Sequence, residues 1–152
     1  MIKILFVCHG NICRSPMAEF VMKDMVKKAG LERHVEIASA ATSTEELGNP
    51  VHHGTRRKLS QVGISCAGKT ARQMNRRDYE YYDIIIGMDR YNMRNMERIC
   101  GGDPQDKLRK LLSRDVADPW YTGNFEDTYA DVLEGCTALL EELRTEIYQI
   151  GK

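Results

Sequence analysis

The chain has 152 residues, and its 22 lysines and arginines balance 22 aspartates and glutamates, so the formal net charge is zero. Binders of nucleic acid or of anionic membrane surfaces usually carry a basic excess, so we expect neither kind of partner. The composition, 42% hydrophobic and 29% charged, excludes collagen-like, coiled-coil and disordered classes. We expect a single domain over residues 1–152.

The first half of the chain alternates strand and helix patterns. Ile2 to Val7 is a short apolar run, typical of a buried strand. A helix is predicted from Pro16 to Lys28, because proline fits a first helical turn and lysines suit a last one. A weaker strand candidate, Val35 to Ala41, precedes a predicted helix from about Thr55 to Val62.

The second half continues this alternation. Tyr82 to Met88 is predicted as the third strand, and a helical pattern through Ile99 follows it. Leu108 to Leu112 is a short fourth strand candidate, and Asp118-Pro119 opens a loop. The clearest helix runs from Phe125 to Ile150, where apolar residues recur every three or four positions.

Strands that alternate with helices predict an α/β fold, a three-layer sandwich in which helices cover both faces of a four-stranded parallel sheet. Ligands of such folds bind beyond the carboxyl ends of the strands, near the first crossover. The loop after Val7 is therefore the first candidate for a functional site.

This loop reads Cys8-His9-Gly10-Asn11-Ile12-Cys13-Arg14-Ser15-Pro16. Five residues between the cysteine and the arginine suffice to curl the backbone so that its N–H groups point inward, at the positive end of the helix dipole. The Arg14 guanidinium would grip two oxygens of a bound anion. The pattern predicts a site for a tetrahedral oxyanion.

Cys8 would lie at the base of this site, where the N–H groups, the helix end and Arg14 favour a thiolate. A thiolate that faces a phosphoryl group is a nucleophile, and its attack would give a cysteinyl phosphate. Ser15 could donate to the sulfur, and Gly10 and Asn11 tolerate left-handed backbone. A buried end-of-strand cysteine beside a surface cation is the alternative, which the position between strand and helix disfavours.

Expulsion of an alkoxide or phenolate also needs a proton donor. Asp118 is the best candidate, because it follows the fourth strand and parallel strands share one carboxyl edge. Pro119 stiffens its presentation, and Trp120 and Tyr121 supply aromatic walls. Spacing alone leaves open an Asp-Pro turn with two aromatic residues packed on the surface.

The five cysteines form an odd, scattered set, which is not typical of a secreted disulfide framework. No apolar run fits a secretory signal or a membrane span, so we expect a cytoplasmic protein with no membrane association. Cys13 shares the loop with Cys8, and we predict a reversible disulfide between them that protects the nucleophile. A Cys13 thiol that merely packs is the alternative.

A rival motif, Gly63-Ile64-Ser65-Cys66-Ala67-Gly68-Lys69-Thr70, fits the nucleotide-binding pattern Gly-x4-Gly-Lys-[Ser/Thr]. That loop should follow a buried strand and open a helix, but Gly63 follows a polar run that resembles a helix. We therefore do not expect NTPase activity. His52-His53 lack metal-like spacing and are expected on the solvated surface, so no metal site is predicted.

The sequence also resembles the low-molecular-weight protein tyrosine phosphatases. The matching pieces run in family order over essentially the whole chain: Val7–Glu19, Ser39–Thr44, Leu47–Pro50, Ala71–Gln73, Tyr82–Asp83, Met88–Asp89 and Asp118–Tyr121. The family implies a four-stranded parallel sheet and hydrolysis of phosphotyrosine without a metal or other cofactor. Tyrosine-phosphorylated proteins or small aryl phosphates are the implied substrates, and we expect a monomer.

The resemblance implies roles for particular residues. Cys8 would be the nucleophile, Arg14 the phosphate clamp, and Asp118 the acid that protonates the phenolate and then activates water. The implied phosphate-binding loop comprises His9, Gly10, Asn11, Ile12, Cys13 and Ser15, with Ser39 as its hydrogen-bonding support. The expected substrate rim comprises Glu45, Leu47, Trp120 and Tyr121.

Two segments depart from the family pattern, and a third position bears on the substrate. Glu45-Glu46 stand where well-known members carry a rim aromatic, which should weaken stacking on the substrate ring and repel acidic peptides. Gly68-Lys69-Thr70 replaces a segment where relatives often carry a histidine that supports the loop. Ile12 matches the tyrosine-specific members, whereas related arginine phosphatases carry threonine there, so phosphotyrosine is favoured over phosphoarginine.

Two further alternatives are weaker. Arsenate reduction on the same fold needs a relay of cysteines, and Cys66, Cys100 and Cys136 offer no close pair in the sequence. A phosphotyrosine-binding module without turnover needs neither a thiolate nor a proton donor. The presence of both Cys8 and Asp118 therefore argues against it.

Overall fold

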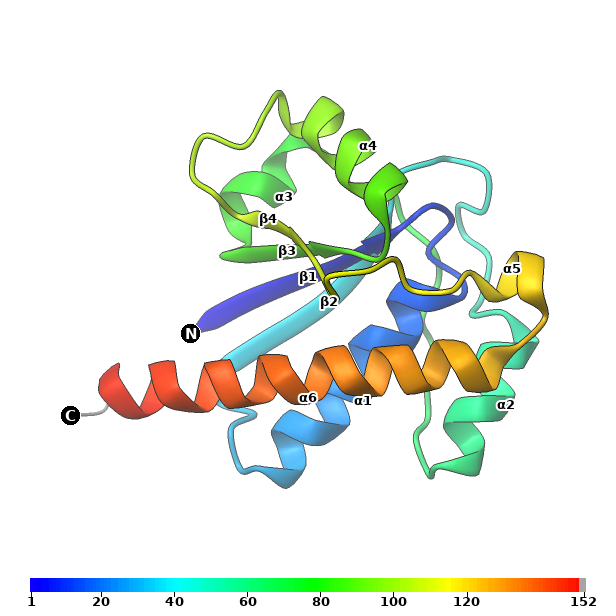
Figure 1. Cartoon of the computed structure of the whole chain (residues 1–152), viewed down its shortest axis with the longest axis horizontal. Helices are drawn as coiled ribbons and strands as arrows, with labels where there is room; N and C mark the ends of the chain where they lie inside the picture. Colours follow the sequence, from blue (N-terminus) through cyan, green and yellow to red (C-terminus); the bar gives the residue numbers. More distant parts are fainter. Residues whose placement is uncertain (151–152) are drawn as a thin grey trace.

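A parallel sheet runs through the middle of the computed structural model, which describes residues 1–150 (Figure 1). Its four strands lie in the order β2-β1-β3-β4. They are β1 (Ile2–Cys8), β2 (Val35–Ala41), β3 (Ile84–Gly87) and β4 (Leu108–Lys110). β1 pairs with β2 along its whole length and with β3 from Ile4 to Val7, so the strand that ends at Cys8 is an inner one.

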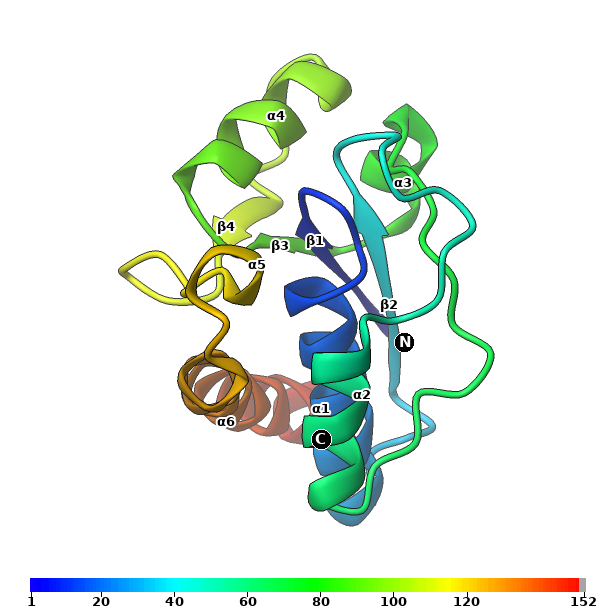
Figure 2. The same ribbon diagram turned by 90° about the vertical axis from the view of Figure 1, so that its right-hand side faces the viewer.

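The helices form the outer layers. Residues 1–150 contain α1 (Arg14–Lys28), α2 (His53–Gln61), α3 (Arg76–Tyr81), α4 (Arg90–Cys100), α5 (Pro119–Thr122) and α6 (Phe125–Ile150). α1 and α6 pack on one face of the sheet and α3 and α4 on the other, while α2 lies against α1 and α6 (Figure 2). The fold is therefore a three-layer α/β sandwich, as the sequence predicts.

Side chains that alternate along β1 divide the core into two layers. Ile4 and Phe6 are fully buried in the layer shared with α1 and α6. Leu5 and Val7 are fully buried in the opposite layer, which includes Met96 of α4. Burial of a large apolar side chain contributes roughly 1.5–3 kcal/mol. β1 is thus held from both sides up to the residue before Cys8.

Several elements differ in extent from the sequence prediction. The third and fourth strands are shorter, because Tyr82 and Asp83 belong to the connection from α3, where the Asp83 carboxylate accepts the Lys3 N–H. α1 begins at Arg14 rather than Pro16, so the proline lies inside the first turn. α2 begins at His53, because His52 Nδ1 accepts the N–H of Gly54 and caps the helix.

Two short helices lie where the sequence suggests none. α3 begins with a capping box. The Asn75 side chain accepts the backbone N–H of Asp78, and the Asp78 side chain accepts the backbone N–H of Asn75. α5 occupies the predicted loop after Asp118, and the Asp118 carboxylate caps it by accepting the Trp120 N–H. Capping and proline at the first position explain α5 better than any apolar pattern does.

The rival nucleotide-binding segment does not have the required surroundings. α2 ends at Gln61, residues 63–70 form a loop that bridges to Pro50 through Thr70, and the next helix begins only at Arg76. No helix within the described part of the chain is both long and apolar enough to cross a membrane.

Candidate active site

The loop between β1 and α1 curls around the sulfur of Cys8. Asn11 adopts a left-handed backbone (φ 58°), and its N–H donates to Cys8 Sγ at 3.3 Å. Ser15 Oγ lies 3.0 Å from the same sulfur. Gly10 is not left-handed, contrary to expectation; a Cβ there would lie 3.3 Å from Glu46 Cγ, so the Glu46 side chain would have to shift slightly.

The loop also presents unused donors. Within residues 1–150, the backbone N–H groups of Gly10, Ile12, Cys13 and Arg14 donate to no protein atom. They lie at the start of α1, where the helix dipole is positive. Such a set of N–H groups favours a bound anion.

A buried polar cluster holds the loop from behind. Asn11 Nδ2 donates to Ser15 Oγ at 2.8 Å and to Ser39 Oγ at 2.9 Å, and Asn11 Oδ1 accepts the Arg72 N–H at 3.3 Å. Ser39 Oγ in turn donates to Glu19 Oε1 at 2.5 Å. Ser39 therefore lies behind the loop, where the resemblance implied a supporting residue.

Glu19 and Lys69 extend this cluster, and the sequence analysis assigned neither to the site. The Lys69 ammonium donates to the Ser39 carbonyl at 2.8 Å and lies 3.6 Å from Glu19 Oε1, while Lys23 donates to Glu19 Oε2 at 2.6 Å. Burial lowers the pKa of Lys69, although Glu19 opposes the shift. Lys69 thus lies behind the loop, and it comes from the segment in which the resemblance led us to expect a histidine.

Arg14 is almost wholly buried and contacts two carboxylates. Its Nη1 donates to Asp89 Oδ2 at 2.8 Å and to the Val116 carbonyl at 3.1 Å, and its Nη2 donates to Asp118 Oδ2 at 3.3 Å. Burial alone would lower the pKa of Arg14, but the charges of Cys8, Asp118 and Asp89 outweigh burial and raise it. The guanidinium is therefore firmly cationic beside Cys8.

Asp89 is a site residue that sequence reasoning missed. It follows β3 and caps α4, where Asp89 and Asn92 form a capping box. The sequence carries a usable signal, a polar residue at the carboxyl end of a strand and at the start of a helix. That signal did not suggest a contact with Arg14, which depends on how the two strands lie in the sheet.

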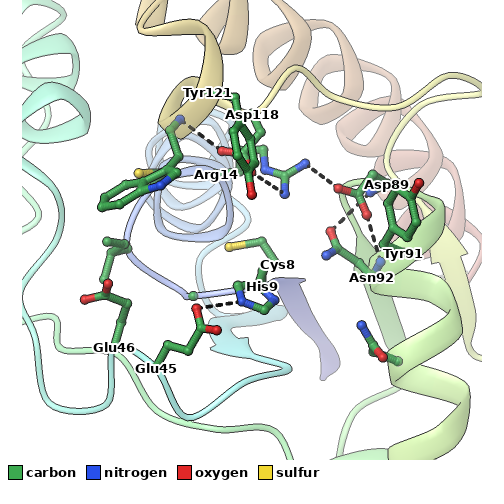
Figure 3. A pocket seen from close by; sticks show the side chains of 15 residues that line it. Cys8, His9, Arg14, Glu45, Glu46, Asp89, Tyr91, Asn92, Asp118 and Tyr121 are labelled. Carbon is green, nitrogen blue, oxygen red and sulfur yellow. Dashed lines mark hydrogen bonds and ion pairs between the residues drawn. The ribbon is translucent and has the colours of Figure 1, made fainter.

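These side chains surround a pocket of about 370 Å³ (Figure 3). Its lining comprises Cys8, His9, Gly10, Ile12, Cys13, Arg14, Glu45, Glu46, Asp89, Tyr91, Asn92, Asn95, Asp118, Trp120 and Tyr121. Of the predicted rim, Glu45, Trp120 and Tyr121 line the pocket, whereas Leu47 is half exposed on the same loop and does not. Tyr91 and Asn95 of α4 are wall residues that the sequence analysis did not suggest.

His9 lines this pocket, and His52 packs beside it against Trp120. His9 Nε2 and Glu45 Oε2 lie 2.9 Å apart and join the phosphate-binding loop to the loop after β2. We expected His52 on the solvated surface, but this expectation is wrong. Its ring stacks on Phe125 at 5.3 Å and meets Trp120 edge-on at 6.0 Å. Burial and the neighbouring charges of His53 and Arg56 lower the pKa of His52.

Cys13 lies in the loop as a buried thiol. Burial raises its pKa to about 12, and the charges of Cys8 and Asp118 act in the same direction. Burial also raises the pKa of Cys136 to about 12, on the inner face of α6.

In the described part of the chain, no three His, Cys, Asp or Glu side chains gather as metal ligands.

Comparison with known proteins agrees with this geometry. A family model described as low molecular weight phosphotyrosine protein phosphatase matches residues 3–149. Low molecular weight protein-tyrosine-phosphatase YfkJ of Bacillus subtilis is 40% identical over 153 residues, which cover 96% of this chain and 98% of that protein. The YfkJ crystal structure covers 96% of both chains with a TM-score of 0.93.

Two other solved structures are also similar. The low molecular weight protein tyrosine phosphatase SP-PTP from Streptococcus pyogenes is 42% identical, with a TM-score of 0.88 over 94% of this chain and 93% of that one. The drosophila arginine phosphatase DARP is 28% identical, with a TM-score of 0.86 over 93% and 98%. The fold is that of these phosphatases. This chain belongs to the low molecular weight phosphotyrosine protein phosphatase family and is a hydrolase of the protein tyrosine phosphatase class.

Proposed function

We propose that this chain hydrolyses phosphotyrosine, in proteins or as small aryl phosphates, in two steps through a cysteinyl phosphate on Cys8. The observation that carries the proposal is the meeting of a thiol, a buried cation and a carboxylate in one pocket, with Arg14 and Asp118 in contact across 104 positions of sequence. A thiol at the base of an anion-binding loop is placed for nucleophilic attack.

In the first step, Cys8 Sγ attacks the phosphorus and the bond to the phenolic oxygen breaks. The leaving oxygen takes the electron pair and receives a proton from the Asp118 carboxyl group. The phosphoryl oxygens accept hydrogen bonds from the loop N–H groups and from Arg14. A bound phosphoryl group competes with Asp118 for Arg14, which releases the carboxyl group toward the leaving oxygen.

In the second step, the Asp118 carboxylate accepts a proton from water as the water oxygen attacks the phosphorus. The phosphorus–sulfur bond breaks, and its electron pair returns to Cys8 Sγ. Ser15 Oγ and the Asn11 N–H, both in contact with the sulfur, stabilise the negative charge that returns there. Inorganic phosphate leaves, and Asp118 is again protonated.

The direct test is hydrolysis of p-nitrophenyl phosphate under reducing conditions with a metal chelator present. We expect turnover by the wild type and a loss of at least about a thousandfold in kcat for Cys8→Ser, because the alcohol is a far weaker nucleophile than a thiolate. Failure of the wild type, or a Cys8→Ser variant that retains the rate, would overturn the proposal.

Asp118 needs a test that separates proton donation from its structural role as the cap of α5. Asp118→Asn keeps a good capping residue but cannot donate the proton, so it is the matched variant for Asp118→Ala. We expect both to slow phosphotyrosine hydrolysis by about a hundredfold or more and p-nitrophenyl phosphate much less, because nitrophenolate leaves without protonation. Equal losses on both substrates would remove Asp118 as the acid.

The preference for phosphotyrosine rests on Ile12, which lines the pocket and is nearly buried. An arginine phosphatase shares this fold, so the fold alone does not decide between the two substrates. We expect kcat/KM for a phosphotyrosine peptide to exceed that for a phosphoarginine peptide of otherwise equal sequence. The reverse order would assign the chain to phosphoarginine.

A further inference from the structure

Tyr91 is a pocket residue with no part in the steps above. It lies on α4 and is 55% exposed, yet it lines the pocket that contains Cys8. Figure 3 shows it on the side of the pocket opposite Glu45 and Glu46, with Cys8 between. An exposed tyrosine at the mouth of a pocket offers a flat apolar surface to an incoming ring.

Several hydrogen bonds hold the first turn of α4, which carries Tyr91. Asn92 Oδ1 accepts the N–H groups of Met88 and Asp89 at 3.0 and 3.1 Å, and Asp89 Oδ1 accepts the Asn92 N–H at 2.7 Å. The other Asp89 oxygen binds Arg14. The helix turn that carries Tyr91 is therefore tied to the guanidinium at the centre of the site.

Two arginines flank the Tyr91 ring. The guanidinium carbons of Arg90 and Arg94 lie 5.3 and 5.7 Å from the ring centroid, within the range of a cation–π contact. Both side chains are exposed, and within residues 1–150 neither guanidinium takes part in an ion pair. This side of the mouth is thus aromatic and positively charged.

The opposite side is acidic. Glu46 accepts a hydrogen bond from Asn49 at 2.6 Å, and Glu45 pairs with His9, so both carboxylates are held at the rim. A peptide that brings its phosphate to Cys8 would pass between a negative wall and a positive one. A charged residue before the phosphotyrosine would then affect binding differently from the same residue after it.

We propose that Tyr91, Arg90 and Arg94 form a recognition shelf that selects phosphotyrosine peptides with an acidic residue on one flank. The inference rests on the proposed function and names its substrate class. The phosphotyrosine ring packs against Tyr91, and a neighbouring Asp or Glu side chain pairs with Arg90 or Arg94. An acidic residue on the other flank meets Glu45 and Glu46 and gains nothing.

The charge part is tested with three phosphotyrosine peptides, which carry acidic residues before, acidic residues after, or alanines on both sides of the phosphotyrosine. We expect one acidic peptide to exceed the alanine peptide in kcat/KM by up to about fivefold, since an exposed ion pair contributes up to about 1 kcal/mol. The advantage should shrink in 1 M salt. Arg90→Glu and Arg94→Glu should remove it.

Arg33→Glu is the matched control, because it makes the same change of charge on an exposed residue just before β2, at the far end of the sheet. It should keep the wild-type preference. An unchanged preference in Arg90→Glu and Arg94→Glu, or equal rates on all three peptides, would overturn the shelf. Hydrolysis of p-nitrophenyl phosphate by the same samples reports separately whether the proposed function holds, and binding of the peptides to Cys8→Ser tests the shelf without turnover.

The aromatic part is tested by Tyr91→Ala and Tyr91→Phe. We expect Tyr91→Ala to raise KM for the preferred peptide by about threefold to tenfold, the range expected for loss of one aromatic contact. Tyr91→Phe should behave as the wild type. The inhibition constant of inorganic phosphate should not change in either variant, because phosphate has no ring to pack. A parallel rise in both constants, or no effect on KM, would contradict the role of Tyr91.

Discussion

At the scale of single residues, Asn11 is the one on which the phosphate-binding loop most depends. It combines a left-handed backbone with side-chain hydrogen bonds to Ser15, Ser39 and the backbone of Arg72. Left-handed backbone costs an ordinary residue roughly 1–2 kcal/mol, and a buried polar group without its partner costs roughly 1–3 kcal/mol. Asn11→Ala carries both costs.

We therefore expect Asn11→Ala to lower the free energy of unfolding by about 2–5 kcal/mol, measured by urea denaturation. Asn11→Gly removes the same hydrogen bonds but suits the left-handed backbone, so it should be about 1 kcal/mol more stable than Asn11→Ala. If Asn11→Gly were as stable as the wild type, the hydrogen bonds would contribute little and this account of the loop would be wrong.

The predicted disulfide between Cys8 and Cys13 also belongs to this scale. Peroxide converts the Cys8 thiolate to a sulfenic acid, and the Cys13 sulfur then displaces hydroxide to form the disulfide. Since burial raises the pKa of Cys13 to about 12, its thiolate fraction is small at neutral pH and rises about tenfold for each pH unit.

We expect the rate of disulfide formation after a peroxide pulse to rise steeply from pH 6 to pH 9, as followed by mass spectrometry. Reduction by dithiothreitol should restore the activity of the wild type, whereas the activity of Cys13→Ala should be lost irreversibly. Inactivation that proceeds identically in Cys13→Ala and in the wild type would show that Cys13 gives no protection.

At the scale of elements, Gly54 marks a close contact between α2 and α6. A Cβ at this position would lie 2.3 Å from two ring carbons of Phe125, the first residue of α6. The same ring packs against Ile12, Cys13 and Ala71 beside the phosphate-binding loop. A displaced Phe125 would therefore disturb both the helix contact and the loop.

Gly54→Ala should lower the free energy of unfolding by about 1–3 kcal/mol, the range for overpacking, and lower Tm by a few degrees. Phe125→Leu makes room, so adding Gly54→Ala to a Phe125→Leu background should cost much less, which calorimetry of the four proteins measures. Equal costs in both backgrounds would place the strain elsewhere.

Elements differ in how well the sequence predicts them, for physical reasons. β2 and α6 have the predicted limits, because seven residues of strand pattern and 26 of helical pattern average out local exceptions. α3 and α5, of six and four residues, carry no periodic signal and depend on their caps. The same contrast holds in the site.

The residues from Cys8 to Ser15 form one contiguous motif, so the sequence predicts their proximity directly. The position of Asp118 near Cys8 could be predicted from the rule that parallel strands share one carboxyl edge. Glu19, Lys69 and Asp89 belong to other segments, and their contacts depend on side-chain packing that no local pattern encodes.

At the scale of the whole molecule, both core layers share β1, and α1 and α6 pack on each other as well as on the sheet. We propose that residues 1–152 unfold as one domain. Circular dichroism at 222 nm and calorimetry should give a single coincident transition, and light scattering should give the mass of a monomer. Two resolved transitions would contradict the single domain.

The loop N–H groups that have no protein acceptor offer a way to measure whether an anion occupies the site. Amides of Ile4 to Val7 lie in a strand paired on both sides and should exchange with deuterium only on unfolding. The amides of Gly10, Ile12, Cys13 and Arg14 have no protein acceptor and should exchange rapidly. An anion held by the loop would slow just that short stretch. Deuterium uptake by one peptide would then measure how full the site is, without any need for turnover.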